Sequence, residues 1–296
     1  MITILFGIIF TTSLVICFKY FVKLKINTFH AILVNYPVAA ITSYIYADKN
    51  FFIDYTDDWF RFSIVIGLLF ILTFVATSIT AQKVSLIVSM IASKMSLVIP
   101  LTYAVLLLGE AMNYLKVTAI VLAMIGVVLT VLQPKGSSGT KPLKLKSFLL
   151  IAVVFIGSGL VDSSFKFIEV NYYSIVPQQF IMMVCYASAG IFGTIFLILS
   201  AFKTKIKIKW RSVIAGVLLG VLNYYSFYFV IEALHIQSMP SSVVIPIINV
   251  GVLLLSTLLA MALFKEKLQK INYAGVIISI LSIVVLALQH YVFREQ

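Results

Sequence analysis

The stretch that decides the fold extends from Val84 to Leu132. It reads VSLIVSMIASKMSLVIPLTYAVLLL at positions 84–108, GEAMN at 109–113 and, after Tyr114, LKVTAIVLAMIGVVLTVL at 115–132. Each apolar segment has about the 20 residues that an α-helix needs to cross a lipid bilayer. The sequence therefore predicts two membrane helices, joined by a short polar hairpin with one acidic residue, Glu110.

The same layout recurs 156 residues further along the chain. The apolar residues 240–264 are followed by the polar segment Lys265-Glu266-Lys267 and then by a second apolar run at 271–288. At this offset Ser85 aligns with Ser241, and Glu110 aligns with Glu266. A repeat on this scale predicts two copies of one structural unit.

The composition is that of a membrane protein. Hydrophobic residues make up 62% of the chain and charged residues 11%, whereas soluble domains have roughly 45–50% and 25%. The net charge of +12 arises from lysines and arginines in short loops between apolar runs, where such residues meet lipid headgroups. We therefore expect membrane lipids around this chain and no nucleic-acid partner.

Ten apolar runs follow one another along the chain, each about as long as a membrane helix. They cover residues 2–18, 29–47, 60–81, 84–108, 115–132, 147–167, 173–200, 213–233, 240–264 and 271–292. The sequence thus predicts an all-α, polytopic protein of the cell (inner) membrane with ten transmembrane helices. The first run lacks a basic segment before it and a small-residue cleavage site after it, so we expect a retained helix rather than a signal peptide.

A linker rich in Gly, Ser and Pro lies at the middle of the chain, at 134–146. It separates a first half, 1–133, from a second half, 147–296, and each half contains five apolar runs. Because five is odd, the second half must enter the membrane upside down relative to the first. Inverted repeats are a recurring design of transporters, with the substrate site near the midplane between the halves.

Lysine and arginine are divided unevenly between the two sets of alternating loops. Sixteen fall in the set that includes the central linker, and five fall in the other set, which also includes both termini. Cytoplasmic loops carry an excess of Lys and Arg. The loop charges therefore predict a cytoplasmic linker and both termini outside the cytoplasm.

The two hairpins and the helices around them resemble the drug/metabolite transporter superfamily, and within it the EamA-like branch of ten-helix proteins. The residues that carry this resemblance are Pro100, Leu107-Leu108-Gly109-Glu110 and Ile125-Gly126-Val127-Val128-Leu129 in the first half, and Gly220-Val221-Leu222-Asn223-Tyr224-Tyr225, Ala233-Leu234, Pro246 and Phe264-Lys265-Glu266 in the second. The resemblance covers the whole chain. It implies two halves around a central cavity that move small metabolites by alternating access. It also implies cytoplasmic termini, so the orientation stays open between the resemblance and the loop charges.

Two charged residues lie deep inside apolar runs. Lys94 is about 15 Å from the start of its run, at 1.5 Å per residue, and Asp162 is the one acidic residue well inside a run. A charge at the bilayer centre costs at least about 2.5–3.5 kcal/mol, so it should face protein or a water-filled cavity. Either Lys94 binds an anionic or carboxylate-bearing substrate while Asp162 accepts a substrate amine or a coupling proton, or the two residues neutralise each other as a structural pair.

Neutral polar residues at similar depth complete the predicted substrate site. They are Asn35, Ser93, Gln178, Asn223, Tyr224, Tyr228 and Asn249. Each could instead form an interhelical hydrogen bond, which is the commoner use of such residues. Asn223 lies about 100° from Tyr224 and about 140° from Tyr228 around a helix, so the three cannot all point the same way. Glu110 and Glu266, at helix ends, are expected to hold the hairpins rather than to touch substrate.

The sequence offers no chemistry for catalysis or for a cofactor. The three histidines are far apart with no partner at metal-ligand spacing, and no GxxxxGK[ST] phosphate-binding motif occurs. We therefore expect a transporter rather than an enzyme, without a cofactor, that functions as a monomer. Its substrate would be a small organic metabolite, amino-acid-like or an organic anion, with export as one option. The alternative is a polytopic membrane enzyme, or an accessory subunit, that acts on a lipid-linked substrate.

Overall fold

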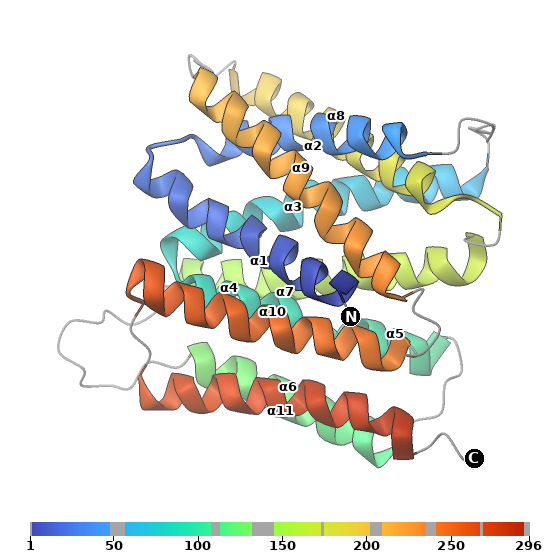
Figure 1. Ribbon diagram of the computed structural model, residues 1–296, viewed down its shortest axis with the longest axis vertical. Helices are drawn as coiled ribbons and strands as arrows, with labels where there is room; N and C mark the ends of the chain where they lie inside the picture. Colours follow the sequence, from blue (N-terminus) through green and yellow to red (C-terminus); the bar gives the residue numbers. More distant parts are fainter. Residues whose placement is uncertain are drawn as a thin grey trace.

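The computed structural model describes residues 2–47, 57–107, 113–131, 145–172, 175–201, 209–234, 241–266 and 269–292. This part of the chain is all helical and contains no β-strand. Its helices lie side by side in one bundle (Figure 1). They are α1 (Ile2–Lys23), α2 (Thr28–Ile45), α3 (Asp58–Lys83), α4 (Leu86–Met95), α5 (Val98–Leu107), α6 (Tyr114–Val131), α7 (Leu145–Tyr172), α8 (Gln178–Ala201), α9 (Trp210–Leu234), α10 (Ser241–Phe264) and α11 (Lys270–Val292).

The helices follow the predicted apolar runs, with one unexpected break. The fourth run forms two helices, α4 and α5, which are separated at Ser96. Pro100 has no N–H to donate to the carbonyl oxygen of Ser96, and this oxygen instead accepts a hydrogen bond from the N–H of Ile99 at 2.9 Å. The expected continuous helix over 84–108 is therefore wrong, and the interruption follows directly after Lys94.

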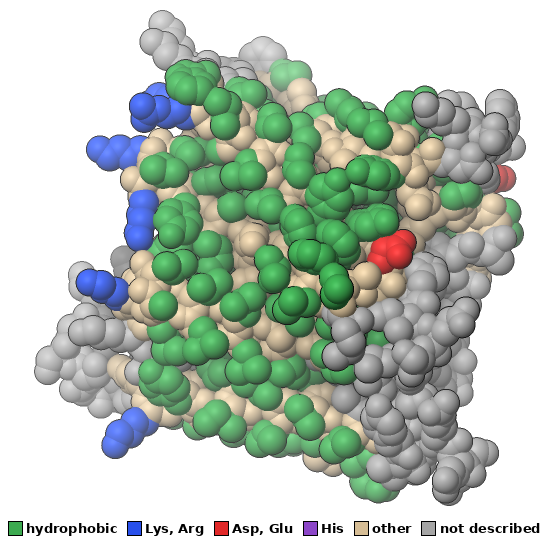
Figure 2. Space-filling view, viewed as in Figure 1, with side chains coloured by type: hydrophobic (Ala, Val, Ile, Leu, Met, Phe, Trp, Pro, Cys, Tyr) green, Lys and Arg blue, Asp and Glu red, His purple; other side chains and the backbone are tan. Residues whose placement is uncertain are grey.

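Seven helical stretches are long and apolar enough to cross a membrane. They are α1, α3, α7, α8, α9, α10 and the stretch Leu86–Tyr103, which α4 and α5 form together. Shorter apolar stretches lie in α6 and α11. Large hydrophobic side chains cover the outside of the bundle between its two ends (Figure 2). The described part of the chain thus has the surface of a membrane protein, apolar outside as well as inside.

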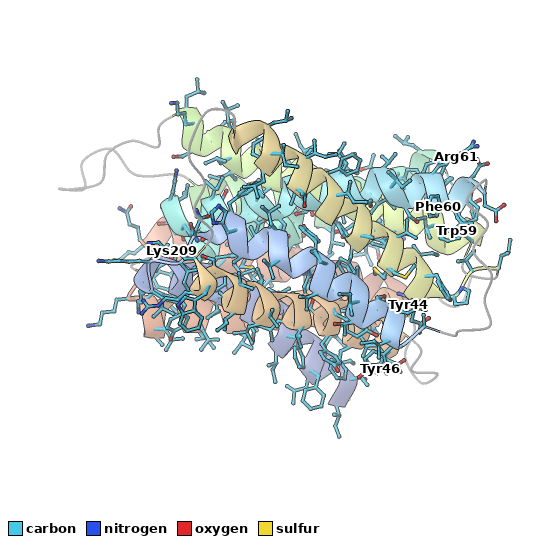
Figure 3. All side chains as sticks on the ribbon, turned by 90° about the horizontal axis from the view of Figure 1, so that it is seen from above. Tyr44, Tyr46, Trp59, Phe60, Arg61 and Lys209 are labelled. Carbon is cyan, nitrogen blue, oxygen red and sulfur yellow. The ribbon has the colours of Figure 1, made fainter. Side chains whose placement is uncertain are left out.

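The two ends of the bundle differ in charge. Exposed Lys and Arg side chains gather along one edge of the molecule (Figure 2). Figure 3 shows Lys209 at this end and Arg61 at the opposite end, beside Trp59 and Phe60. The exposed basic residues at the ends of helices on the lysine-rich side are Lys23, Lys25, Lys83, Lys146, Lys209, Arg211, Lys265 and Lys270. The predicted imbalance between the two sides is therefore present in the described residues.

The helix contacts occur in matched pairs. α2 packs on α9, and α8 packs on α3. α1 packs on α9 and α10, while α7 packs on α3 and on α4 with α5. α6 and α11 pack on each other at one side of the bundle (Figure 1). When α1, α2 and α3 are exchanged for α7, α8 and α9, and α10 for α4 with α5, each of these contacts maps onto another of them.

Glycines bring the crossing helices close together. A Cβ atom on Gly216 of α9 would lie 2.7 Å from the carbonyl oxygen of Ala31 in α2. On Gly67 of α3, it would lie 2.6 Å from the carbonyl oxygen of Cys185 in α8. Small residues at such crossings allow two helix backbones to approach in a membrane. The two crossings are thus built in the same way.

A polar cluster joins three helices at the lysine-rich end. The carboxylate of Glu266, just after α10, lies 2.8 Å from the ammonium of Lys19 in α1. Its two oxygens also accept hydrogen bonds from the Ser85 hydroxyl at 2.7 Å and from the Leu86 N–H at 3.0 Å, where α4 begins. The side chain of Glu266 therefore joins α10 to α1 and α4, whereas the sequence had predicted that it holds its own hairpin. Glu110 lies outside the described residues. We call these four residues the Glu266 cluster.

Candidate functional site

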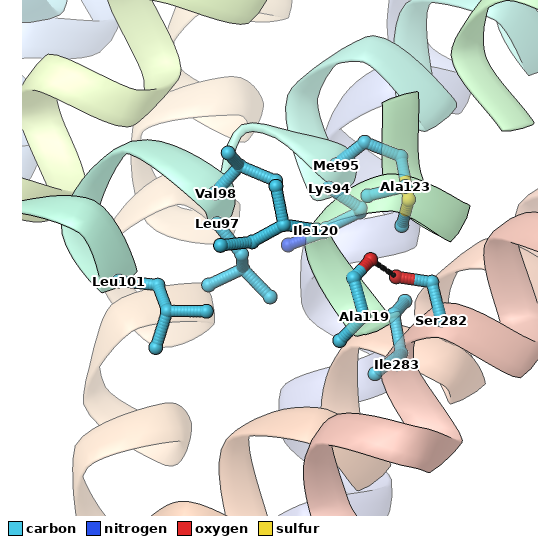
Figure 4. A pocket seen from close by; sticks show the side chains of 10 residues that line it. All are labelled: Lys94, Met95, Leu97, Val98, Leu101, Ala119, Ile120, Ala123, Ser282 and Ile283. Carbon is cyan, nitrogen blue, oxygen red and sulfur yellow. Dashed lines mark hydrogen bonds between the residues drawn. The ribbon is translucent and has the colours of Figure 1, made fainter. Parts of the chain in front are cut away.

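Lys94 occupies the last turn of α4, directly before the break. Its side chain is half-buried, and within the described residues it makes no hydrogen bond or ion pair. It lines a small cavity between α4, α5, α6 and α11, where the hydroxyl of Ser282 donates to the Ala119 carbonyl oxygen at 2.7 Å (Figure 4). The cavity volume is about 10 Å³, which is room for about one water molecule.

Asp162 lies on α7 and points into the bundle. The lipid-facing stripe of this helix consists of large exposed side chains at Leu149, Val153, Ile156 and Leu160. Asp162 follows Leu160 by two residues, which is about 200° around a helix, yet its side chain is also exposed. The carboxylate therefore lies on the side of α7 opposite this stripe.

Lys94 and Asp162 are neighbours that do not pair. Their charges lie close enough to interact through space, but no nitrogen–oxygen distance between them is 4.0 Å or less. Beside them, the hydroxyl of Ser158 in α7 donates to the hydroxyl of Ser93 in α4 at 3.1 Å. This hydrogen bond joins α4 to α7, one helical turn before Asp162. The two charges thus stand on packed helices without forming the direct structural pair that the sequence had left open.

Three of the predicted site residues come together elsewhere, in a second cavity. Gln178 of α8 and Tyr224 and Tyr228 of α9 line a space of about 70 Å³ between α2, α8 and α9. The full lining is Ser43, Gln178, Gln179, Met182, Tyr186, Tyr224, Phe227, Tyr228, Ile231 and Glu232. We call this space the tyrosine pocket. It lies away from the lysine-rich end, because α8 begins, and α2 and α9 end, on the other side of the bundle.

The tyrosine pocket contains several buried polar atoms without partners. The side-chain nitrogen of Gln178 and the hydroxyls of Tyr186 and Tyr224 have no hydrogen bond in the structure, although Tyr186 is 0% and Tyr224 only 4% exposed. Leaving such a group unsatisfied costs about 1–3 kcal/mol. Three of them in one cavity point to a polar occupant.

Stacked tyrosine rings form one wall of this pocket. The ring of Tyr46 stacks on Tyr224 with centroids 5.5 Å apart, and Tyr224 stacks on Tyr228 at 5.9 Å. The hydroxyls of Tyr46 and Tyr225 are 3.0 Å apart, within hydrogen-bonding distance. Tyr46 caps the end of α2, so the stack fixes α2 against α9 where the pocket lies.

A cluster of four aromatic rings lies beside the pocket and reaches α7. Phe70 contacts Phe165, Tyr186 and Phe227 with ring centroids 5.5–5.7 Å apart, and Phe165 contacts Phe227 at 5.8 Å. Tyr186 and Phe227 line the tyrosine pocket, while Phe165 lies three residues from Asp162 on α7. We call this group the aromatic cluster.

The remaining predicted residues lie outside both cavities. Asn223 donates through Nδ2 to Oδ1 of Asn35 at 3.1 Å, and both side chains are buried. They form an interhelical hydrogen bond at the α2–α9 crossing, and Asn223 points away from Tyr224 and Tyr228 as its place on the helix predicted. Asn249 is buried on α10, which packs on α4, but no hydrogen bond within the described residues joins it to Ser93.

Two residues of the pocket were missed in the sequence. Glu232 follows Tyr228 by four residues and Tyr224 by eight, so all three share one face of α9. Tyr186 follows Gln178 by eight residues on α8 and shares its face in the same way. This spacing was a usable signal for both residues. Among the described residues, no group of three or more His, Cys, Asp or Glu side chains could hold a metal ion.

Comparison with known proteins finds similarity to a curated protein and to solved structures. No family model matches the sequence. The chain is 28% identical over 287 residues to an uncharacterized protein of Haemophilus influenzae, covering 94% of this chain and 95% of that protein. A structure described as "Crystal structure of protein" superposes with a TM-score of 0.59 at 13% identity, covering 96% of this chain and 98% of that one. At this identity the likeness establishes a shared fold.

Proposed function

We propose that this chain is a secondary transporter that moves a small organic metabolite across the cell membrane by alternating access. The observation that carries the proposal is the unpaired state of Lys94 and Asp162, which lie on packed helices inside an apolar bundle. Charges in the membrane interior are costly, and they mark substrate or ion pathways. A purely structural pair would gain most from direct contact. Charges held apart leave room for a ligand that satisfies both.

The same two charges favour a substrate class. The Lys94 ammonium is suited to a carboxylate or another organic anion, and the Asp162 carboxylate is suited to an amine or a coupling proton. An amino-acid-like molecule, which carries both charges, would satisfy the pair at once. The break between α4 and α5 adds support, because interrupted helices line the binding sites of many transporters.

The architecture we propose is ten transmembrane helices in two inverted five-helix repeats, as in EamA-like members of the drug/metabolite transporter superfamily. In this arrangement α4 and α5 together form the fourth span. The matched pairs of helix contacts support it, since exchanging the two halves maps the contacts of α2 with α9, of α1 with α9 and of α1 with α10 onto counterparts in the other half. The similar glycine crossings of α9 on α2 and of α3 on α8 support it as well.

The two ends of the bundle also differ as alternating access requires. The Glu266 cluster ties α1, α4 and α10 together at the lysine-rich end, whereas the tyrosine pocket lies toward the opposite end. Pockets for small molecules usually hold about 300–1,000 Å³, so in this conformation neither cavity has the size of an ordinary substrate site, and the tyrosine pocket has room only for a very small molecule. A transported molecule would need a wider conformation, which is what a cycle between two states supplies.

Counterflow into liposomes tests the proposal. The purified protein would be assayed against amino acids, organic acids and nucleosides, and then compared with Lys94→Met, Asp162→Asn and the double variant. We expect each variant to lose transport at least about tenfold, because a hydrogen bond to a charged group contributes about 1.5–3 kcal/mol. The control is Lys209→Met, which replaces an exposed lysine at the end of the bundle where α4 begins. This variant should transport at the parent rate.

Thermal stability separates the substrate role from a structural one. Removing one partner of a structural pair leaves a buried charge without its partner and destabilises the protein. Removing both partners can leave the stability nearly unchanged. We expect the double variant to melt at or above the temperature of the parent and still to be inactive. Transport by the double variant at the parent rate would remove the basis of the proposal.

A further inference from the structure

We propose that the tyrosine pocket is a second binding site, separate from Lys94 and Asp162, for a small organic ammonium that carries a hydrogen-bond acceptor. Neither of the two charged residues lines the pocket, and the aromatic cluster extends from the pocket's Tyr186 and Phe227 to Phe165 on α7. Its role in transport, as the first site that the substrate occupies, rests on the proposed function. Its ability to bind the ligand does not depend on the proposed function.

The unpartnered polar atoms define the acceptor on the ligand. The amide nitrogen of Gln178 can only donate, and each tyrosine hydroxyl has a proton to donate. The hydroxyls of Tyr186 and Tyr224 are buried and make no hydrogen bond. A ligand oxygen within reach of these donors would satisfy them together. The neighbouring Ser43 is not available, because its hydroxyl already donates to the Gln179 carbonyl oxygen at 2.8 Å.

The charge of the pocket defines the rest of the ligand. Glu232 is its one charged lining residue, and no Lys or Arg lines it. Within the described residues the Glu232 carboxylate makes no ion pair. Beside it stand the rings of Tyr224 and Tyr228, and aromatic rings of this kind attract cations. A carboxylate, aromatic rings and a set of donors together fit a cation with one acceptor group, and they disfavour a free anion.

The lining of the pocket explains why this is a separate site. Neither Lys94 nor Asp162 lines it. Tyr186 and Phe227 belong to both the pocket and the aromatic cluster, and Phe165 of the cluster lies three residues from Asp162 on α7. In a transporter, movement of these rings would connect the two sites.

Equilibrium dialysis with purified protein in detergent tests the site. The probe is radiolabelled ethanolammonium, with unlabelled ethylammonium, which lacks the acceptor, and acetate, which lacks the cation, as competitors. We expect ethanolammonium to bind, ethylammonium to compete at least about threefold more weakly, and acetate not to compete. Equal competition by acetate would contradict a cation site.

Matched variants assign the binding to this pocket. Glu232→Gln should weaken binding about tenfold, as expected for loss of one charge-assisted contact, and Tyr224→Phe should weaken it severalfold without unfolding the protein. The controls are Asp58→Asn, an exposed acid outside the pocket, and Tyr273→Phe, whose hydroxyl contacts Met261 instead. Unchanged affinity in Glu232→Gln would refute the assignment.

The Lys94→Met variant separates this inference from the proposed function. We expect it to bind ethanolammonium with the parent affinity while transport is lost. If binding disappears with Lys94→Met, the pocket is not a separate site and the inference fails. If instead no substrate is ever transported but Glu232-dependent binding persists, only the transporter proposal fails.

A phospholipid headgroup could present the same ammonium, so the membrane composition is varied as well. Affinity for ethanolammonium would be measured in nanodiscs of phosphatidylglycerol with and without phosphatidylethanolamine. A site for a soluble ligand gives the same affinity in both. Weaker apparent binding in the presence of phosphatidylethanolamine would assign the pocket to lipid and overturn the inference.

Discussion

The carboxylate of Glu266 lies 2.8 Å from the ammonium of Lys19, and the two side chains are only 14% and 17% exposed. This ion pair bridges the end of α10 and the end of α1. Because Glu266 also accepts hydrogen bonds at the start of α4, one side chain holds three helices together. Separating these helices at the lysine-rich end requires that the ion pair break first.

We therefore expect Glu266→Gln to loosen the lysine-rich end. The glutamine keeps the size of the side chain but replaces the ion pair, and loss of a partly buried charge interaction costs about 1–3 kcal/mol. A cysteine in place of Val88, a buried residue in the first turns of α4, would report opening through its rate of labelling by a soluble maleimide. The background protein would lack Cys17 and Cys185. A severalfold faster rate is expected, and an unchanged rate would show that the cluster does not control access.

Pro100→Ala should close the break between α4 and α5. The alanine supplies an N–H that can donate to the carbonyl oxygen of Ser96. A proline inside a helix costs about 3 kcal/mol. We expect the melting temperature in detergent to rise by several degrees. Transport should fall, because a straight helix would displace Lys94. Faster or unchanged transport in a stabilised variant would mean that the break is not needed for function.

Gly216→Ala should destabilise the protein, since the new Cβ would lie 2.5 Å from Cβ of Val34 and 2.7 Å from the Ala31 carbonyl oxygen. Overpacking of this kind costs about 1–3 kcal/mol. Gly7→Ala is the control, because there the nearest atom, on Val230, is 3.5 Å away. Its alanine should be neutral or stabilising, given the higher helix propensity of alanine. If both variants changed the melting temperature in the same direction, this account of the α2–α9 crossing would be contradicted.

The charges at the lysine-rich end predict the orientation of the protein in the membrane. Cytoplasmic loops are enriched in Lys and Arg, so a cysteine in place of Lys209 should be shielded from an impermeant maleimide in intact cells. A cysteine in place of Asp58, at the other end, should be labelled. The background would again lack Cys17 and Cys185. The reverse pattern would place both termini in the cytoplasm, as the EamA-like resemblance implies.

Helix positions could be predicted from the sequence because apolar runs of membrane length are set by composition alone. The break at Ser96 could not, because Pro100 is compatible with either a bend or two separate helices, and packing decides between them. The relation between Lys94 and Asp162 was also open. Their separation depends on how α4 meets α7, and sequence spacing carries no information about that.

The polar residues show the same limit. The helical angles of Asn223 and Tyr224 correctly predicted that they point apart, since both lie on one helix. Their partners, Asn35 and Tyr46, come from α2 and could be identified only from the packed structure. Glu232 lay on the same face as Tyr224 and Tyr228, but which face of α9 borders a cavity is a property of the whole bundle.

The two glycine crossings are alike but not identical. Gly220 gives the α2–α9 crossing a second close approach, with a Cβ 2.6 Å from the Asn35 carbonyl oxygen, whereas Ile71 stands at the corresponding place in α3. In a molecule whose halves exchange roles, perfect equivalence would make the two end states equal in energy. In the proposed cycle, a resting preference for one end state would come from unequal positions such as Gly220 and Ile71. Substituting that pair would tune the preference without touching any ligand.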